Sequence, residues 1–98
     1  MKVHNINGTS DNTCKCGSWK AHWEKYNEYH RSWPDYCSEK SCIHPPTVGA
    51  HVQKEESSSA KWYIIPLCKE HNDRFGESIE VGDGTSFASA NRSETCEK

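Results

Sequence analysis

The sequence predicts a small α+β domain that is stabilised by zinc and carries an additional amphipathic helix near its N-terminus. Three observations lead to this prediction. The chain has 98 residues, the size of one domain, yet only 33% of them are hydrophobic. It contains six cysteines and six histidines, which are the side chains that zinc prefers as ligands. A chain with so lean a hydrophobic core needs a further source of stability, and a metal site supplies one.

The first part of the chain is predicted to be an arm followed by a helix. Residues 1–13 are polar and include an Asn-Gly turn signal, so they are expected to form a flexible arm. A helix is predicted over about residues 18–32, ended by Pro34. Its aromatic and imidazole side chains recur every three or four residues, on one helix face, at Trp19, Trp23, Tyr26, His30 and Trp33. We interpret this stripe as core packing; a platform for stacked nucleic-acid bases is the alternative.

The second half of the predicted domain consists of short strands and one helix. The expected elements are strands over 48–53 and 61–66, a helix over 67–76 and a strand over 79–81. A polar loop over residues 54–60 joins the first two strands. Residues 82–98 are rich in Gly, Ser and Asn and are expected to form a flexible tail, so the predicted domain spans residues 14–81.

The environment of the chain bears on how its cysteines are used. Residues 1–11 are polar and contain no apolar segment of a signal peptide, and no stretch approaches the roughly 18 apolar residues of a transmembrane helix. We therefore expect a cytoplasmic protein that does not contact a membrane. In the cytoplasm, clusters of Cys and His more often bind metal than form disulfides. The formal net charge of −2 provides no general attraction to nucleic acid.

Four metal-ligating side chains occur as two pairs at the spacing of a zinc site. Cys37 and Cys42 lie on a turn-rich segment, separated by four residues. Cys68 and His71 lie three positions apart at the start of the helix predicted over 67–76, so they share one helix face. Zinc takes four nitrogen and sulfur ligands in a tetrahedron, and a helix N-terminus favours the thiolate form of cysteine. We therefore expect one structural Zn²⁺ on these four side chains.

Residues 37–76 resemble an HNH-type ββα-metal finger, which is a kind of treble clef. In that family a cysteine pair precedes a strand that ends in Asp-His-Val or Asp-His-Ile, and a helix carries Cys-x2-Cys followed by His or Asn. Here residues 50–52 read Ala-His-Val, and residues 68–72, Cys-Lys-Glu-His-Asn, fall where the helix motif would be, with His71 at the place of its second cysteine. The resemblance implies metal-dependent cleavage of a phosphodiester, with His51 as general base and Asn72 as a ligand of Mg²⁺ or Mn²⁺.

The chain departs from the family pattern where the catalytic metal would bind. Ala50 stands in place of the acidic ligand, and no Asn precedes the second strand. Hard cations need oxygen ligands, and few are present. We therefore expect a zinc-binding recognition module, an inhibitor or adaptor without catalytic activity, whose partner is a protein rather than a nucleic acid. The alternative is a metal-dependent endonuclease that uses His51.

A second pair of thiols, Cys14 and Cys16, lies outside the finger-like segment. In one interpretation they bind a second zinc ion together with His51 and another histidine. The histidines considered for that position are His22, His30 and His44. In another they replace the first cysteine pair in the predicted zinc site, and in a third they are free thiols of a redox or metal-buffering protein. Cys96 has no evident partner and is expected to be a free thiol.

Overall fold

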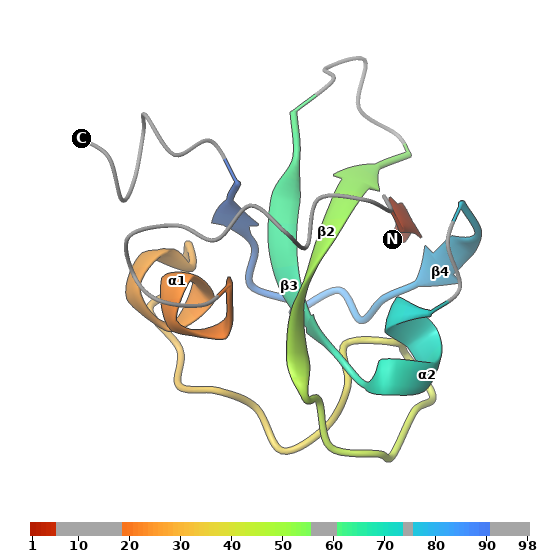
Figure 1. The fold of residues 1–98 in the computed structure, drawn as a ribbon, viewed down its shortest axis with the longest axis horizontal. Coiled ribbons are helices and arrows are strands. Elements are labelled where there is room, and N and C mark those ends of the chain that lie inside the picture. The colour runs from red at the N-terminus through yellow and green to blue at the C-terminus, as the bar shows by residue number, and fades with distance from the viewer. Residues whose placement is uncertain (6–18, 56–60, 74–75, 91–98) are drawn as a thin grey trace.

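The computed structural model is a five-stranded antiparallel sheet with a helix on either side of its central hairpin (Figure 1). It describes residues 1–5, 19–55, 61–73 and 76–90. The strand order is β4-β1-β2-β3-β5, and the α+β class is confirmed. The elements are β1 (Lys2–Asn5), α1 (Trp19–Tyr26), β2 (Val48–Lys54), β3 (Tyr63–Leu67), α2 (Lys69–Asn72), β4 (Ser78–Glu80) and β5 (Ala88–Ser89).

The sheet separates two groups of buried residues, because successive side chains of a strand point to opposite faces. One face, here termed the cysteine face, combines sheet residues with two thiols; its buried members include Val3, Ala50, Val52, Ile65, Leu67, Cys37 and Cys68. The opposite face, termed the α1 face, is covered by the first helix; its buried members are Trp19, Trp23, Ile64 and Ala88. Helix α1 therefore packs on one face of the sheet, and α2 begins on the other, directly after Cys68.

The central hairpin agrees with the prediction. β2 and β3 pair along five residues, from Val48 opposite Leu67 to Val52 opposite Tyr63. β4 lies within one residue of the strand predicted over 79–81. In the part of the chain that is described, no helix has the length and apolar character needed to cross a membrane.

The N-terminal segment begins inside the sheet, so the expectation of a flexible arm over residues 1–13 is wrong for its first residues. β1 lies between β2 and β4, where Val3 pairs with Lys54 on one side and with Ile79 on the other. The Val3 side chain is fully buried. Only one of the four β1 residues is hydrophobic, so composition alone does not predict a strand there. Residues 6–13 lie outside the described part.

Helix α1 ends at Tyr26, well before the predicted end at residue 32. The buried side chain of Asn27 donates to the carbonyl oxygens of Trp23 (2.9 Å) and Arg31 (3.0 Å). Its Oδ1 accepts the backbone N–H of Arg31 at 2.7 Å. A side chain that bonds the backbone in this way competes with further helical turns. His30 then has a left-handed backbone conformation with φ 53°, and its N–H donates to the Asn27 carbonyl oxygen at 3.1 Å to close a turn.

The aromatic stripe packs largely into the core, as interpreted from its spacing. Trp19 and Trp23 are buried, and Tyr26 and Trp33 are partly buried against the same cluster. His30 is exposed, because the helix has already ended before it. The stripe therefore works as a packing face of α1 and of the turn that follows.

The α1 helix lies very close to the sheet at Gly49 of β2. A Cβ atom at this position would come within 2.7 Å of the carbonyl carbon and oxygen of Trp19, and within 2.9 Å of Ile64 Cγ2. Real Cβ contacts are longer, so any larger residue would push the start of α1 away from the sheet.

The segment predicted as a tail, residues 82–98, belongs to the fold at least as far as residue 90. β5 pairs with the start of β3. The buried Ser86 hydroxyl donates to Asn27 Oδ1 at 2.7 Å, and its carbonyl accepts the indole N–H of Trp23 at 2.8 Å. These contacts hold α1 on the sheet, so the predicted domain boundary at residue 81 is too early. Residues 91–98 are not among those described.

Candidate metal centre

Helix α2 is a single turn that begins directly after Cys68, its N-cap residue. It is shorter than predicted because the Asn5 side-chain amide donates to the carbonyl oxygens of His71 (3.2 Å) and Asn72 (2.7 Å). The N–H of Gly76 donates to the Asn5 carbonyl at 2.9 Å rather than continuing the helix. β1 thus ends the helix after the one turn that places Cys68 and His71 on the same side.

The other two thiols come from a loop over residues 37–42, termed the knuckle. Backbone hydrogen bonds attach it to the sheet on two sides. The N–H of Ser38 donates to the Pro66 carbonyl of β3 at 3.0 Å, and the N–H of Lys40 donates to the Glu80 carbonyl of β4 at 2.8 Å. The knuckle is therefore held beside the start of α2.

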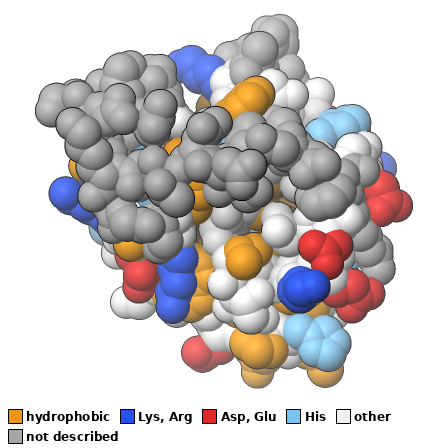
Figure 2. Space-filling view, viewed as in Figure 1, with side chains coloured by type: hydrophobic (Ala, Val, Ile, Leu, Met, Phe, Trp, Pro, Cys, Tyr) orange, Lys and Arg blue, Asp and Glu red, His pale blue; other side chains and the backbone are white. Residues whose placement is uncertain are grey.

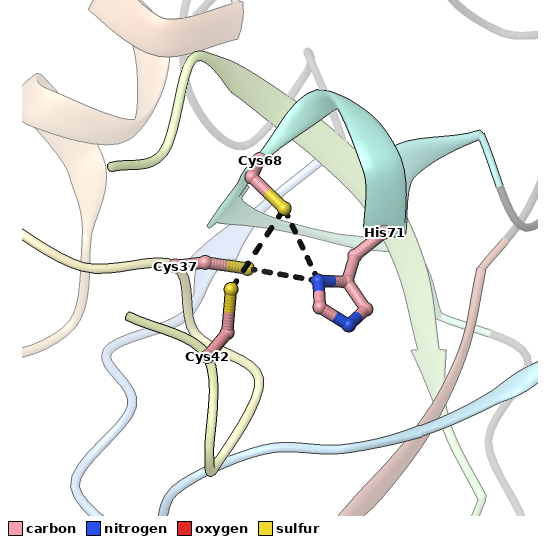
Figure 3. A group of neighbouring side chains, drawn as sticks. All are labelled: Cys37, Cys42, Cys68 and His71. Carbon is pink, nitrogen blue, oxygen red and sulfur yellow. Dashed lines mark hydrogen bonds between the residues drawn. The ribbon is translucent and has the colours of Figure 1, made fainter. Parts of the chain in front are cut away.

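The four side chains expected to form one site lie together (Figure 3). The ligand atoms of Cys37, Cys42, Cys68 and His71 are all within 4.8 Å of one another. His71 Nδ1 lies 3.1 Å from Cys68 Sγ and 3.6 Å from Cys37 Sγ. Cys42 Sγ lies 4.0 Å from Cys68 Sγ. The group can hold a metal ion. In the alternative arrangement Cys14 and Cys16 would lie beside Cys68 and His71, and in the structure Cys37 and Cys42 lie there.

The three thiols of this group are free cysteines, not disulfide partners. Burial raises the pKa of the Cys37 thiol to about 12, and the neighbouring Cys68 contributes to the increase. Such a thiol stays protonated at neutral pH unless a positive charge stabilises the thiolate. A bound cation provides that charge, since coordination displaces the thiol proton. The crowding of three thiols is therefore typical of a metal site.

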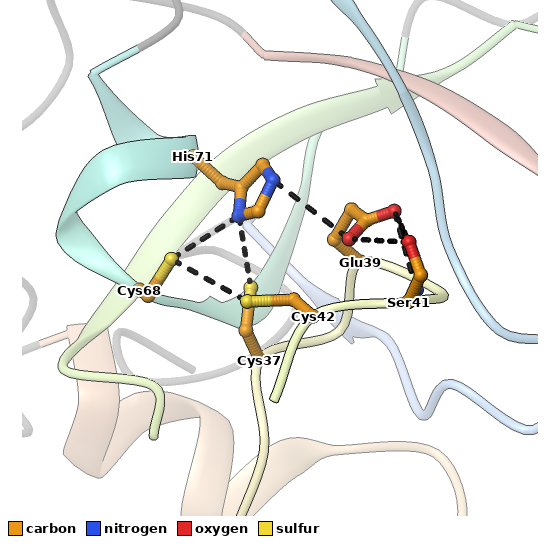
Figure 4. A network of polar contacts seen from close by, with 6 residues as sticks. All are labelled: Cys37, Glu39, Ser41, Cys42, Cys68 and His71. Atoms are coloured by element: carbon orange, nitrogen blue, oxygen red, sulfur yellow. Dashed lines mark hydrogen bonds and ion pairs between the residues drawn. The ribbon is translucent and has the colours of Figure 1, made fainter. Parts of the chain in front are cut away.

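Glu39 contacts His71 from within the knuckle (Figure 4). Glu39 Oε2 lies 3.8 Å from His71 Nε2, and Glu39 Oε1 accepts the Ser41 N–H (3.2 Å) and hydroxyl (3.0 Å). A histidine ligand commonly donates its second ring N–H to a carboxylate, which fixes the tautomer and orientation of the ring. Glu39 was not predicted from the sequence, where its only signal is its place between two cysteines.

His51, the predicted general base, lies on the α1 face. Its neighbour Val52 belongs to the cysteine face, so the His51 side chain points the other way. Its ring packs edge-on against Trp19 (4.5 Å between ring centroids) and Trp62 (6.3 Å). The pKa of His51 is lowered to about 4, mainly by burial and in smaller part by the nearby His22. The ring is therefore neutral at pH 7.

Asn72, the predicted ligand of a catalytic metal, lies on the cysteine face. Its carbonyl accepts the Asn5 side-chain amide, and Asn5 pairs with Val52 in the β1–β2 ladder. Because Val52 and His51 point to opposite faces, the structure does not bring His51 and Asn72 into one site.

The residues considered for a second zinc site differ in burial, and some lie outside the described part of the chain. Cys14, Cys16 and Cys96 lie outside the described part of the chain. His22 is fully buried in α1, and its ring packs on Trp19, as does the ring of His51. The other two candidates, His30 and His44, are exposed.

Comparison with family models, with curated proteins and with solved structures found no match. The resemblance to HNH-type fingers therefore depends on the motif residues alone. A function has to be argued from the chemistry of the site, because a fold by itself does not identify one.

Proposed function

We propose that this protein is a small zinc-stabilised recognition module that binds another protein, and that it does not cleave nucleic acid. The observation that carries the proposal is the separation of the metal-ligating cluster from His51 by the sheet. Four protein ligands complete a tetrahedron and leave no open position for water or substrate. A site of that kind stabilises a fold, whereas catalytic zinc keeps an open position.

Zinc is the metal that suits the donor set best. Three thiolates and one imidazole are soft and borderline ligands, which select zinc over Mg²⁺ or Mn²⁺. With Zn–S bonds of about 2.3 Å, a tetrahedron places its ligand atoms about 3.5–4 Å apart. Three separations between ligand atoms are 3.1, 3.6 and 4.0 Å, close to this range, and all the ligand atoms lie within 4.8 Å of one another. A knuckle, a hairpin and a helix that starts at a ligand also favour the treble-clef interpretation.

The surroundings of His51 argue against the nuclease alternative. The side chain is 6% exposed, so a phosphodiester and an attacking water have little access to the ring. Ala50 beside it cannot bind a cation, and Asn72 lies on the other face of the sheet. A general base needs to reach the proton that it removes, and the burial of the His51 ring keeps a substrate water away from it.

The outer side of the knuckle is the surface we assign to the partner. Tyr36, just before the knuckle, is 60% exposed, and Ile43, just after it, is 77% exposed. A cleft of about 380 Å³ lies between the knuckle and the turn at Gly82 and Gly84. Exposed aliphatic and aromatic side chains beside a cleft are typical of protein-binding surfaces.

The charges around this cleft favour a protein over a nucleic acid. Arg31 and Lys40 line the cleft, but so does Glu39, and Asp35 is exposed beside Tyr36. On the face shown in Figure 2, the acidic and basic side chains of the described residues are mixed. Nucleic-acid binding needs a basic surface that follows the phosphates, and mixed charge does not provide one.

Metal analysis and a cleavage assay test the first part of the proposal. The chain purified without chelator is expected to contain zinc. With Mg²⁺ or Mn²⁺ added, neither the wild type nor His51→Ala is expected to cleave plasmid or single-stranded DNA. Cleavage by the wild type that is lost in His51→Ala would establish the nuclease alternative instead.

The partner surface is tested with Ile43→Asp and a matched control, Lys25→Ala, which makes the same change in net charge on the exposed side of α1. Proteins retained from an extract by the immobilised wild type are identified, purified and titrated against each variant. We expect at least a tenfold weaker affinity for Ile43→Asp and no change for Lys25→Ala, with equal zinc contents. A labelled oligonucleotide that binds more tightly than any of these proteins would contradict the proposal.

A further inference from the structure

We infer that the cleft beside the knuckle is a carboxylate-binding site, in which Arg31 and Lys40 hold an acidic side chain of the partner protein. This inference rests on the proposed function and names the chemistry by which the partner is recognised. The ligand class is an extended peptide segment that carries one Asp or Glu beside apolar residues. The carboxylate enters the cleft, and the apolar residues pack on the exposed side chains of Tyr36 and Ile43.

The cleft combines apolar walls with positive charge. Its volume of about 380 Å³ is within the range of roughly 300–1,000 Å³ that is usual for ligand pockets. Trp23, Pro34 and Tyr36 contribute apolar surface, and Arg31 and Lys40 contribute the cations. A cleft of this composition suits a side chain that has an apolar stem and an anionic end group.

The Arg31 guanidinium is held in the wall of this cleft. Its Nη1 donates to the Gly84 carbonyl oxygen at 2.6 Å, and its central carbon lies 5.2 Å from the centre of the Tyr29 ring. A guanidinium has five N–H donors, so the bond to Gly84 leaves others for a ligand. Its planar fork matches the two oxygens of a carboxylate, and an arginine that is already oriented loses less side-chain entropy when it binds one.

The backbone around Arg31 is fixed as well. His30, the preceding residue, has a φ of 53°, a left-handed conformation that costs free energy in a residue with a side chain. The Arg31 N–H donates to Asn27 Oδ1 at 2.7 Å, and the Arg31 carbonyl accepts the Asn27 amide at 3.0 Å. Asn27 itself is only 1% exposed. Such strain persists where the surrounding structure enforces it, and it is concentrated at functional sites. The strained turn therefore supports a binding role for the arginine that follows it.

Lys40 adds a second positive charge at the cleft. Its side chain is exposed, and among the described residues its ammonium has no ion-pair partner. Glu39 also lines the cleft, but its carboxylate accepts the Ser41 N–H and hydroxyl and lies 3.8 Å from His71 Nε2 (Figure 4). The Glu39 carboxylate is thus directed toward the metal ligands. The charge that remains for a ligand of the cleft is positive.

Two cations in a cleft suit a single carboxylate better than a nucleic acid. Hydrogen bonds from arginine or lysine to a carboxylate are roughly twice as strong as bonds between neutral groups, and salt screens them less when the pair is partly buried. A nucleic acid needs basic side chains that follow successive phosphates, and Arg31 and Lys40 are the basic residues that line this cleft. The site therefore matches an acidic side chain of a protein.

A library of displayed random peptides, selected on the zinc-loaded full chain, tests the inference. We expect the enriched peptides to share one Asp or Glu beside hydrophobic residues. The best peptide is then synthesised with its C-terminus amidated, and its affinity is measured by fluorescence polarisation. Replacing the shared acid with its amide, Asp with Asn or Glu with Gln, should weaken binding at least tenfold. A free C-terminus in place of the amide should not change the affinity, which distinguishes a side-chain carboxylate from a terminal one.

Variants of the cleft locate the site that the peptide occupies. Arg31→Gln should bind the acidic peptide at least tenfold more weakly than the wild type, and should no longer distinguish it from its neutral form. Arg31→Lys should give an intermediate affinity, because lysine keeps the charge but lacks the planar fork. Lys25→Gln, which makes the same charge change on the exposed side of α1, should bind like the wild type.

Lys40→Gln keeps the test decisive if Arg31→Gln fails to fold, since the Lys40 ammonium pairs with no described residue. It should weaken the acidic peptide about threefold and leave the neutral peptide unaffected. Zinc content and urea unfolding of every variant show whether the fold is intact.

The outcomes separate this inference from the proposed function. Peptides that lose affinity in Ile43→Asp but share no acid, or that bind Arg31→Gln as tightly as the wild type, would overturn the inference and leave the proposed function standing. Binding that requires a free C-terminus, or the absence of any enriched peptide, would overturn the inference as well. Failure of the proposed function is detected separately, by DNA cleavage or by an oligonucleotide that binds more tightly than any protein.

Discussion

The cysteine face and the α1 face of the sheet are stabilised in different ways. On the cysteine face, the knuckle meets α2, a helix of four residues with none buried. On the α1 face, a helix of eight residues buries Trp19, His22 and Trp23, and buried hydrogen bonds fasten it to the segment around Ser86. Elements too short to bury a core need ligand bonds, whereas a longer helix can use aromatic packing. Loss of the metal should therefore unfold the whole domain, whereas damage to the α1 packing should lower stability without releasing the metal.

Cys68→Ser should have the largest effect, because it removes a ligand that joins the knuckle to α2. Structural zinc contributes about 10–16 kcal/mol of apparent binding free energy in small zinc peptides, compared with about 5–15 kcal/mol for the stability of a whole domain. We expect loss of one ion and of cooperative thermal unfolding by circular dichroism. Removing zinc from the wild type with a chelator should likewise abolish its near-UV signal.

Cys96→Ser is the matched control for this prediction, because it makes the same chemical change outside the four ligands. It should leave the melting temperature and the zinc content unchanged. Equal destabilisation by the two variants would show that the cysteines have been assigned to the wrong roles.

The parts of the fold that the sequence predicts well are those with a local signal. The hairpin is encoded by β-branched and aromatic runs, and the proximity of the four ligands by pairs at short spacing. The face on which His51 lies follows from strand alternation, but only once its neighbours Ala50 and Val52 are known to face the cysteines. Motif resemblance alone placed His51 and Asn72 in one site.

The parts that were mispredicted depend on contacts between distant residues. Asn5 ends α2 and Asn27 ends α1, and neither asparagine has a sequence signal for that role. β1 and β5 are strands because they complete the sheet beside β2 and β3, although their own residues are mostly polar or small. Glu39 contacts His71 across the knuckle. Tertiary hydrogen bonds override local propensity at each of these points.

Asn27→Ala should break the α1 face without affecting the metal. The buried amide bonds Trp23, Arg31 and Ser86, and its removal leaves several buried donors and acceptors unsatisfied. We expect a loss of about 2–4 kcal/mol in the free energy of unfolding by urea, at unchanged zinc content. Glu28→Ala, at the exposed next position, serves as control. Loss of zinc in Asn27→Ala would contradict this difference between the two faces.

Acidification should also act on the α1 face, through His51. The pKa of His51 is about 4 in the folded protein and about 6.5 when unfolded. Between these pH values the unfolded state binds a proton that the folded state does not, so stability is lost as the pH falls from 6.5 to 4. The loss attributable to His51 is at most about 3 kcal/mol. Stability should not change through this ring above pH 7.

The comparison that isolates this effect is the wild type against His51→Gln, measured by urea unfolding from pH 7.5 to 4.5. Acid also protonates the knuckle thiolates, but that contribution is common to both proteins and cancels in the difference. The variant should have the shallower pH dependence. The same sign holds if His51 binds a metal, because the proton and the metal compete for one lone pair. Parallel curves would show that His51 is protonated equally in both states.

Glu39→Gln should produce the smallest effect, confined to the cysteine face. Glu39 Oε2 lies 3.8 Å from His71 Nε2, so the carboxylate acts on the ring through its negative charge, and the neutral amide lacks that charge. The imidazole should therefore become a weaker ligand. Loss of such a partner typically lowers metal affinity 10- to 100-fold, about 1.4–2.7 kcal/mol, which competition with a chromogenic chelator resolves. Asp73→Asn is the control, because Asp73 is exposed, pairs with Lys69 and makes the same charge change near His71. If both variants weaken zinc binding equally, the effect is one of overall charge; if only Glu39→Gln does, the knuckle contributes an orienting carboxylate as well as two thiolates.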